Sequence, residues 1–235
     1  MKRPALSVLI AAYNEEETIV ECIERVERVA IEMEIIIVND GSTDGTRAAL
    51  DTLALTRDPE RFRVLHSPRN EGKGAALRRG IPLCRGEMTI VQDADLEYDP
   101  QDYPALTAPI EAGASSVVYG SRRLHPERSY PLDRHLLGSY LLTTVANLLY
   151  GAGITDEPTC YKVFRTELLQ SLPLCCRRFE FCPEVTALLA LRGYAIEEVP
   201  IRYSKRSVAQ GKKIRWTDWV MALVTLLRLR LPWPQ

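Results

Sequence analysis

Residues 89–100 read Thr89-Ile90-Val91-Gln92-Asp93-Ala94-Asp95-Leu96-Glu97-Tyr98-Asp99-Pro100, an apolar run that ends in closely spaced carboxylates. The spacing Asp93-x-Asp95-x-Glu97 places hard oxygen ligands at the C-terminal end of a predicted strand, where open α/β sheets bind their ligands. A divalent metal that holds a diphosphate would fit this pattern. A solvated acidic turn is the alternative, because Asp99-Pro100 is a turn signal and short Asp-x-Asp matches are common.

Three strand-to-helix units precede this stretch. Each begins with an apolar run and continues with apolar residues at helical spacing. The predicted strands are residues 5–13, 33–38 and 62–66, and the predicted helices are residues 19–29, 43–55 and 75–84. Alternation of strands and helices predicts an α/β fold, with a mostly parallel central sheet, right-handed crossovers and flanking helices.

Polar loops follow the C-terminal ends of the predicted strands. They are Tyr13-Asn14-Glu15, Asp40-Gly41-Ser42, Gly72-Lys73 and Asp93-Ala94-Asp95. Because parallel strands end at one edge of a sheet, we expect these loops to converge. The edge would suit a nucleoside diphosphate, with Asp40 near the base and with Lys73 and a helix N-terminus near the negative charge. Taken singly, each loop is ordinary turn chemistry.

Length, charge and cysteine usage limit the possible classes of protein. The 235 residues fit one large α/β domain, and the net charge of −1 excludes a uniformly basic or acidic protein. From Pro200 onward, however, eight basic residues stand against one acid, which suits an anionic surface. A nucleic-acid partner is disfavoured, because this tail contains no recognisable recognition module.

The cysteines and the apolar runs indicate in which cellular compartment the protein is expected. The six cysteines show neither metal-binding spacing nor a secreted disulfide framework, so we expect reduced thiols. The N-terminal residues lack the apolar core of a signal peptide, and no uninterrupted apolar run is long enough to span a bilayer. We therefore expect a cytoplasmic protein that can still lie on a membrane surface.

The second half of the chain carries a helix with an unusual distribution of side chains. Residues 134–150 place His135, Ser139, Thr143 and Asn147 on one narrow polar stripe, and leucines occupy most of the remaining positions. This pattern is typical of a helix buried deep in a core and equally of an interfacial helix that presents leucines to lipid. Residues 179–184 are expected to open a second, amphipathic helix that runs through Leu191, followed by a strand over residues 196–203.

Three charged residues of this half have competing interpretations. Arg122 follows a predicted strand and suits phosphate, because a guanidinium group binds phosphate bidentately, but a surface arginine is the alternative. Asp156 could act as a general base, could orient an acceptor or arginine, or could cap a turn. Glu184 lies in the first turn of a helix, where capping explains it as well as catalysis does.

The motifs of the chain resemble those of family 2 nucleotide-sugar glycosyltransferases with a GT-A fold. The resemblance rests on residues 7–16, 37–44, 72–76 and 93–95, and residues 120–122, 159–162 and 198–200 extend it nearly end to end. Within that family the chain is similar to the dolichol-phosphate mannosyltransferase-like branch, which transfers a sugar from a nucleotide to a polyprenyl phosphate.

The resemblance implies roles for individual residues. Donor binding falls to Ala12, Tyr13, Asn14, Glu15, Asp40, Lys73, Asp93 and Ala94. Mg²⁺ or Mn²⁺ would be bound by Asp93, Asp95 and Glu97. Acceptor binding falls to Arg122, Arg134, Ser139, Arg202 and Arg206, and the catalytic residues would be Asp95, Asp156, Arg122 and Arg206.

The resemblance also implies an organisation of the chain. Residues 1–203 would form the GT-A domain, with a nucleotide-sugar half (1–100) and an acceptor half (101–203). Residues 204–235 would form a basic loop and an amphipathic C-terminal helix. The family favours the membrane interpretation of the helix at residues 134–150, so the protein would lie peripherally on the cytosolic face of a membrane.

The expected activity is metal-dependent, inverting transfer from a UDP- or GDP-sugar to a polyprenyl phosphate. Transfer to a saccharide hydroxyl is the alternative, and it would require Asp156 as the base. A nucleotidyltransferase or a binding module without turnover is disfavoured. The first predicted strand ends in Tyr13-Asn14-Glu15 instead of a glycine-rich loop containing arginine.

Overall fold

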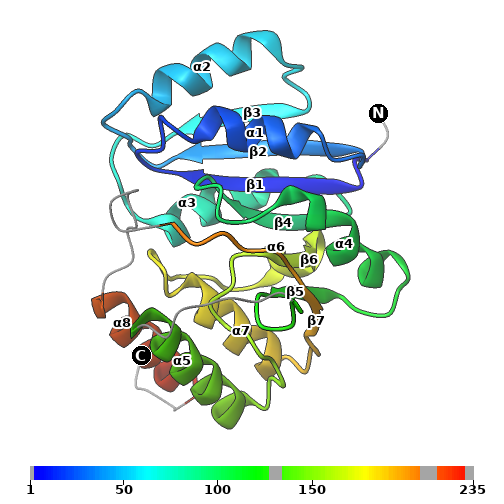
Figure 1. The fold of residues 1–235 in the computed structure, drawn as a ribbon, viewed down its shortest axis with the longest axis vertical. Helices are drawn as coiled ribbons and strands as arrows, with labels where there is room; N and C mark the ends of the chain where they lie inside the picture. The colour runs from blue at the N-terminus through cyan, green and yellow to red at the C-terminus, as the bar shows by residue number, and fades with distance from the viewer. Residues whose placement is uncertain (1–2, 127–133, 207–215, 231–235) are drawn as a thin grey trace.

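A computed structural model describes residues 3–126, 134–206 and 216–230, with only the backbone at positions 134 and 135. Within these ranges the chain forms one seven-stranded sheet, in the order β3-β2-β1-β4-β6-β5-β7 (Figure 1). The strands are β1 (Leu6–Ala12), β2 (Met33–Asn39), β3 (Phe62–His66), β4 (Met88–Asp93), β5 (Val117–Ser121), β6 (Lys162–Arg165) and β7 (Glu197–Pro200).

Most neighbouring strands of the sheet run parallel, as predicted. β1 pairs in parallel with β2 and β4, β2 with β3, and β5 with β7. The exception is β6, which lies antiparallel between β4 and β5 and which the sequence patterns do not predict. This strand has only four residues with a charged residue at each end, so it gives no recognisable apolar period.

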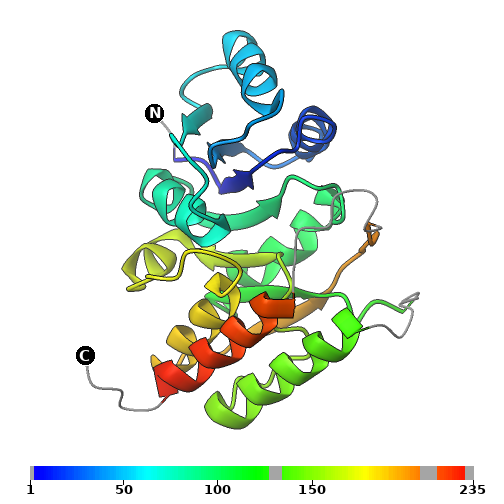
Figure 2. The same cartoon turned by 90° about the vertical axis from the view of Figure 1, so that its left-hand side faces the viewer.

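Helices cover both faces of the sheet. They are α1 (Ile19–Glu27), α2 (Thr46–Thr56), α3 (Lys73–Gly80), α4 (Tyr103–Glu111), α5 (Arg134–Tyr150), α6 (Thr166–Ser171), α7 (Phe181–Leu191) and α8 (Trp216–Arg230), with short 3₁₀ turns η1 (Ile81–Leu83) and η2 (Pro100–Asp102). In Figure 2, α3 and α6 lie on one side of the sheet and α1 and α4 on the other. The α/β fold class is confirmed.

The sequence patterns miss α4. This helix contains Pro109 and begins beside Pro104. Because proline inside a helix removes a backbone hydrogen bond, the sequence does not predict a continuous helix here. Burial of Tyr103, Leu106 and Ile110 against the sheet stabilises it nonetheless.

Helices α5, α7 and α8 pack on one another at the C-terminal end of the molecule (Figure 2). A small apolar cluster joins them, made of Leu142, Ala146, Ala187, Ala222 and Leu226. No described helix is both long and apolar enough to cross a bilayer. The predicted C-terminal helix is present as α8, whereas the boundaries drawn at residues 100 and 203 stay predictions.

One buried carboxylate ties together the N-terminal ends of four strands. Glu34 of β2 accepts a hydrogen bond from Ser7 Oγ of β1 at 2.6 Å and from Arg63 Nη2 of β3 at 2.6 Å. The backbone N–H groups of Arg85 and Gly86, just before β4, also donate to it. Glu34 therefore lies at the edge of the sheet opposite the one where these strands end and the polar loops begin.

We expect Glu34→Gln to destabilise the protein by about 2–4 kcal/mol at pH 7, because buried donors lose their charged acceptor. Burial raises the pKa of Glu34, but hydrogen bonds from Ser7 and Arg85 and the charge of Arg63 outweigh it, so the pKa is lowered. A carboxyl group of this kind stabilises the folded state above its unfolded pKa of about 4.3. The difference between variant and wild type should therefore shrink as the pH falls below about 4.

Urea denaturation at pH 7 and pH 3 measures the effect. Glu167→Gln is the matched control, because Glu167 pairs with Arg3 while its side chain is 81% exposed, and its loss should cost less than about 1 kcal/mol. An equal loss for Glu34→Gln at both pH values would show that its charge does not stabilise this edge.

Candidate functional site

The polar loops after β1, β2 and β4 converge at one edge of the sheet, as predicted. The loops after β1 and β2 are joined by the N–H of Asp40, which donates to the carbonyl of Ala12 at 2.8 Å, and by the N–H of Asn14, which donates to Ser42 Oγ at 3.0 Å. β1 also lies beside β4, with Ala11 opposite Asp93. Side chains from the three loops can therefore act on one ligand.

The loop after β1 is held in a fixed shape. Asn14 has a positive φ of 50°, and its Oδ1 accepts the N–H of Thr43 at 2.8 Å. Asparagine tolerates this left-handed conformation better than most residues. The loop sets Glu15, which is 8% exposed, against the edge, and Tyr13 before it is half-buried.

Asp40 holds the neighbouring loop rather than standing free. Its carboxylate accepts the N–H of Glu71 at 3.0 Å and the N–H of Gly72 at 2.7 Å. Asp40 is nearly fully buried, so these two backbone donors satisfy its charge. Its contact with a base stays a prediction, while its structural effect is to fix the start of α3.

Lys73, the first residue of α3, extends from this loop toward the predicted metal site. Its Nζ lies 2.5 Å from Asp93 Oδ1 and 3.5 Å from Cys160 Sγ. Burial lowers the pKa of Lys73, but the charge of Asp93 outweighs it and raises the pKa well above its usual value. Lys73 is therefore a fixed positive charge at this edge.

Two N–H groups at the N-terminus of α3 are occupied by hydrogen bonds within the protein. The N–H of Gly74 donates to the carbonyl of Arg178 at 3.1 Å, and the N–H of Ala75 donates to the carbonyl of Arg177 at 2.8 Å. Helix N-termini bind anions through such N–H groups only when the groups are unpaired. Sequence reasoning missed this, because the partner turn lies about 100 residues further along the chain.

Arg206 lies against the carboxylates of this edge. Its Nη1 is 3.1 Å from Glu15 Oε2, and its Nη2 is 3.3 Å from Asp95 Oδ2. Burial raises the pKa of Asp95, and the charges of Asp93 and Glu97 raise it further, to about 7, although Arg206 opposes them. The repulsion between carboxylates at this edge therefore favours a bound cation.

Glu97 is already engaged by the segment that carries Arg206. Its Oε2 accepts the hydroxyl of Tyr203 at 2.5 Å, and its Oε1 accepts the N–H of Arg206 at 2.8 Å. Ser204 also donates its N–H to the carbonyl of Glu97 at 2.8 Å. Sequence reasoning missed Tyr203, because nothing near it in the chain marks Glu97 as its partner.

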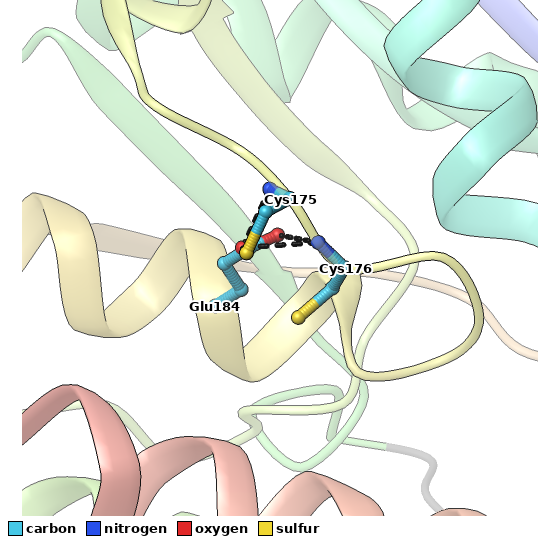
Figure 3. A group of neighbouring side chains, drawn as sticks. All are labelled: Cys175, Cys176 and Glu184. Carbon is cyan, nitrogen blue, oxygen red and sulfur yellow. Dashed lines mark hydrogen bonds between the residues drawn. The ribbon is translucent and has the colours of Figure 1, made fainter. Parts of the chain in front are cut away.

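The structure does not bring Asp93, Asp95 and Glu97 together as a closed set of three ligands. Among the described residues, ligand atoms of three His, Cys, Asp or Glu side chains lie within 4.8 Å of one another only at Cys175, Cys176 and Glu184 (Figure 3). The donor set at the edge fits Mg²⁺ or Mn²⁺ held by one or two carboxylates with phosphate oxygens completing the coordination. Metal ligation by these residues stays a prediction.

Arg122, whose side chain is 17% exposed, forms an ion pair with Asp156, whose side chain is 1% exposed. Arg122 Nε lies 2.7 Å from Asp156 Oδ2, and Arg122 Nη2 lies 2.7 Å from Asp156 Oδ1. Burial raises the pKa of Asp156, but the charge and hydrogen bonds of Arg122 outweigh it and hold the pKa below its usual value. The Arg122 guanidinium also lies 5.0 Å from the ring centre of Tyr203, which joins this pair to Glu97.

Glu198, on β7, supports this ion pair and was missed by sequence reasoning. Its carboxylate accepts the N–H of Thr155 at 2.7 Å and the N–H of Asp156 at 3.1 Å. A charged acceptor holds the loop before Asp156 in place. The motif around Glu198 marks its position but not its partner.

The remaining predicted acceptor residues lie apart from this pair. Ser139 is buried and accepts a hydrogen bond from Arg123 Nη2 at 2.8 Å. Arg202 pairs with Asp99 at 2.9 Å and with Asp102 at 2.8 Å, on the surface. Arg134 begins α5, and its side chain lies outside the described residues. Acceptor binding by these three residues stays a prediction.

A protein-family model and curated relatives match the chain. The model described as Glycosyl transferase family 2 matches residues 7–172. Polyprenol monophosphomannose synthase from Mycolicibacterium smegmatis is 33% identical over 213 residues, which cover 87% of this chain and 79% of the relative. An undecaprenyl-phosphate 4-deoxy-4-formamido-L-arabinose transferase from Pseudomonas fluorescens is 28% identical over 230 residues, covering 94% and 64%. The chain thus spans just under two thirds of the second relative's length.

A solved structure has the same fold. Glucosyl-3-phosphoglycerate synthase from Mycobacterium tuberculosis, crystallised with Mn²⁺, UDP and phosphoglyceric acid, superposes with a TM-score of 0.71. The match covers 99% of this chain and 80% of that chain, at 21% sequence identity. The predicted GT-A-like fold is thereby confirmed.

We expect Asp156→Asn to lower the free energy of unfolding by about 3 kcal/mol, because it leaves the Arg122 guanidinium buried beside a neutral amide. Thermal and urea denaturation measure the loss. Asp99→Asn is the matched control, because Asp99 also pairs with an arginine but is 36% exposed, so its loss should cost less than about 1 kcal/mol. Equally small losses in both variants would contradict a structural role for the buried pair.

Proposed function

The chain belongs to glycosyl transferase family 2, as its motifs predict, and from this premise we propose its reaction. It transfers one sugar, with inversion, from a nucleoside diphosphate sugar to a polyprenyl phosphate. The observation that carries the proposal is the gathering of three cationic side chains, Lys73, Arg122 and Arg206, at one carboxylate-lined edge. Two anionic substrates that meet during transfer require such an arrangement.

The donor side comprises the loops after β1, β2 and β4. Asn14 and Glu15 are fixed by their contacts with the loop after β2, so this edge is shaped before a ligand arrives. Lys73 supplies a positive charge where the diphosphate would lie. The choice between a uracil and a guanine base stays open, because Asp40 is occupied by backbone donors.

Asp95 and Asp93 are the residues we propose to hold a divalent cation. Burial and mutual repulsion favour a cation there, and carboxylate oxygens are the ligands that Mg²⁺ and Mn²⁺ accept. The mycobacterial synthase of the same fold was crystallised with Mn²⁺, which is consistent with this class of ion. When bound, the cation would neutralise charge that develops on the leaving diphosphate.

The acceptor is proposed to be a phosphate rather than a hydroxyl. Both oxygens of Asp156 pair with Arg122, and the lowered pKa of Asp156 makes it a weak base. A phosphate is already anionic near neutral pH, so its attack needs no base. Relatives named as polyprenol monophosphomannose synthase and undecaprenyl-phosphate arabinose transferase support a lipid-linked phosphate.

The protein's own residues would bring the two substrates into line. Arg122 would orient the acceptor phosphate, because its guanidinium is fixed by Asp156 and Tyr203. Arg206 would place its charge between the two phosphate groups from its position beside Asp95. Attack at the anomeric carbon from the acceptor side then inverts the configuration without a covalent enzyme intermediate.

We expect the protein to release nucleoside diphosphate in step with glycosyl-lipid when given UDP- or GDP-sugars, polyprenyl phosphate and Mg²⁺ or Mn²⁺. Asp95→Asn should lower kcat by about 100-fold or more, because it removes a carboxylate that would hold the cation, and the cation would neutralise charge on the leaving diphosphate. Glu111→Gln, at an exposed position of α4, is the control and should retain activity. Release of pyrophosphate, or turnover with hydroxyl acceptors alone, would contradict the proposal.

The surface of α5 and α8 supports a membrane location. On α5, Leu137 is 61% exposed, Leu141 is 53% exposed and Leu148 is 80% exposed. Ser139 and Thr143 of its polar stripe are buried instead, and Thr143 donates to the carbonyl of Ser139 and accepts the N–H of Glu157. The exposed leucines exclude deep burial of this helix within the described chain.

Helix α8 packs beside α5 and likewise exposes apolar residues while it buries a polar one (Figure 2). Its exposed apolar residues are Trp216, Val220, Met221, Val224 and Leu227, whereas Asp218 is buried. Arg228 and Arg230 follow at its C-terminal end. Two neighbouring helices that both expose apolar residues, with basic residues at the end of one, suit the interface of an anionic bilayer, where the lipid-linked acceptor would lie.

We expect the double variant Leu141→Asp, Leu148→Asp to sediment with anionic phospholipid vesicles at least about tenfold less than wild type, since each leucine removed from lipid costs roughly 1.5–3 kcal/mol. Leu55→Asp is the control, because Leu55 is 87% exposed on α2, far from this surface. Circular dichroism would check that the variants fold. Sedimentation of the double variant equal to that of wild type would rule out this surface as the docking site.

A further inference from the structure

Residues 175–178, called the turn of residues 175–178, form hydrogen bonds both with α7 and with the start of α3. The turn lies between α6 and α7, and its carbonyl groups reach the helix that begins with Lys73. Figure 3 shows Cys175 and Cys176 of this turn with their backbone nitrogens directed at Glu184 of α7. The turn therefore has an amide side and a carbonyl side, each with its own partners.

Glu184 binds the amide side of the turn. Its Oε1 accepts the N–H of Cys175 at 2.8 Å, and its Oε2 accepts the N–H of Cys176 at 3.0 Å. Glu184 is 1% exposed, so its charge is balanced by these backbone donors and not by water. A buried carboxylate with two amide donors holds the turn in one conformation.

The carbonyl side of the turn binds α3. The carbonyls of Arg177 and Arg178 accept the N–H groups of Ala75 and Gly74, and the carbonyl of Cys175 accepts Arg78 Nη1 at 2.8 Å. These bonds satisfy two of the free N–H groups in the first turn of the helix.

The approach of the turn to α3 is close. A Cβ atom at Gly72 would lie 2.5 Å from the carbonyl oxygen of Arg177, and one at Gly74 would lie 2.8 Å from the carbonyl oxygen of Cys176. Only glycine fits at both positions, and Gly72 also has a positive φ of 103°. A shift of the turn would therefore be transmitted to the backbone on both sides of Lys73.

The residues in Figure 3 are held together by hydrogen bonds to Glu184. Both Glu184 oxygens accept backbone N–H groups, and the Cys175 thiol donates to Oε1 at 3.0 Å. The hydrogen bond to Glu184 raises the pKa of Cys175, and burial followed by the charge of Glu184 raises the pKa of Cys176. Both shifts favour the protonated thiols, whereas a metal would bind the thiolates.

We propose that Glu184 is a positioning residue for Lys73. Its carboxylate fixes the turn of residues 175–178, the turn fixes the first turn of α3, and α3 directs the Lys73 ammonium group at Asp93. Asp40 holds the same loop from the other side through Glu71 and Gly72. The consequence for catalysis rests on the proposed donor site, in which Lys73 binds the diphosphate.

Hydrogen exchange tests the structural part without any nucleotide. We expect Glu184→Gln, which keeps the shape but loses the charge, to speed exchange of the Gly74 and Ala75 amides about tenfold. Cys175→Ala and Cys176→Ala keep the backbone donors and should leave this exchange unchanged. Unchanged exchange in Glu184→Gln would overturn the proposal, and so would cysteine variants that match its effect.

A double-mutant cycle with Lys73→Met tests the functional part. We expect Glu184→Gln to weaken the binding of UDP or GDP about tenfold and to raise the donor KM about tenfold, with a smaller change in kcat. In the Lys73→Met background the same substitution should change binding less than about twofold. A general loss of structure would instead give the same factor in both backgrounds, and that result would overturn the proposal.

Melting temperature separates unfolding from misplacement of Lys73, because Glu184→Gln should retain a cooperative transition at the assay temperature. If Glu184→Gln speeds amide exchange but the wild-type protein binds neither UDP nor GDP, the structural role of Glu184 would stand and the donor site would be refuted. Nucleotide binding that is insensitive to Glu184→Gln would refute the role of Glu184 and keep the donor site.

Discussion

Repulsion between carboxylates at one edge of the sheet is the constraint on which the site depends. Asp93, Asp95 and Glu97 follow one strand within five residues, so the local chain cannot supply their counter-charges. Lys73 arrives from the preceding helix, and Arg206 arrives from beyond the last strand. Because clustered charges in a partly buried site must be balanced, cationic side chains from distant segments lie at the same edge as the acidic motif.

The same principle organises the other half of the site. The largely shielded guanidinium of Arg122 pairs with both oxygens of Asp156, and Glu198 in turn binds the backbone N–H of Asp156. Tyr203 links this group to Glu97, with its hydroxyl on the carboxylate and its ring beside Arg122. The two halves are thus joined through the contacts of one tyrosine.

Sequence patterns predicted the parts of the structure that depend on residues close together in the chain. The alternating units before residue 93 and their polar loops are set by neighbours in the chain, and they were found as expected. The outward direction of the α5 leucines was left open, because a polar stripe on a helix does not say which side meets the sheet. The roles of Glu184 and Glu198 were invisible, because each acts on backbone amides that no side-chain pattern marks.

The antiparallel strand β6 has a consequence for the order in which the fold assembles. It separates a block of parallel strands that closes within residues 6–93 from a pair, β5 and β7, whose partners are about 80 residues apart. Contacts close in sequence form faster than distant ones, so the first block can form during synthesis. The acidic edge would then remain without Arg206 until translation has passed that residue, so the site would mature later than the block of parallel strands.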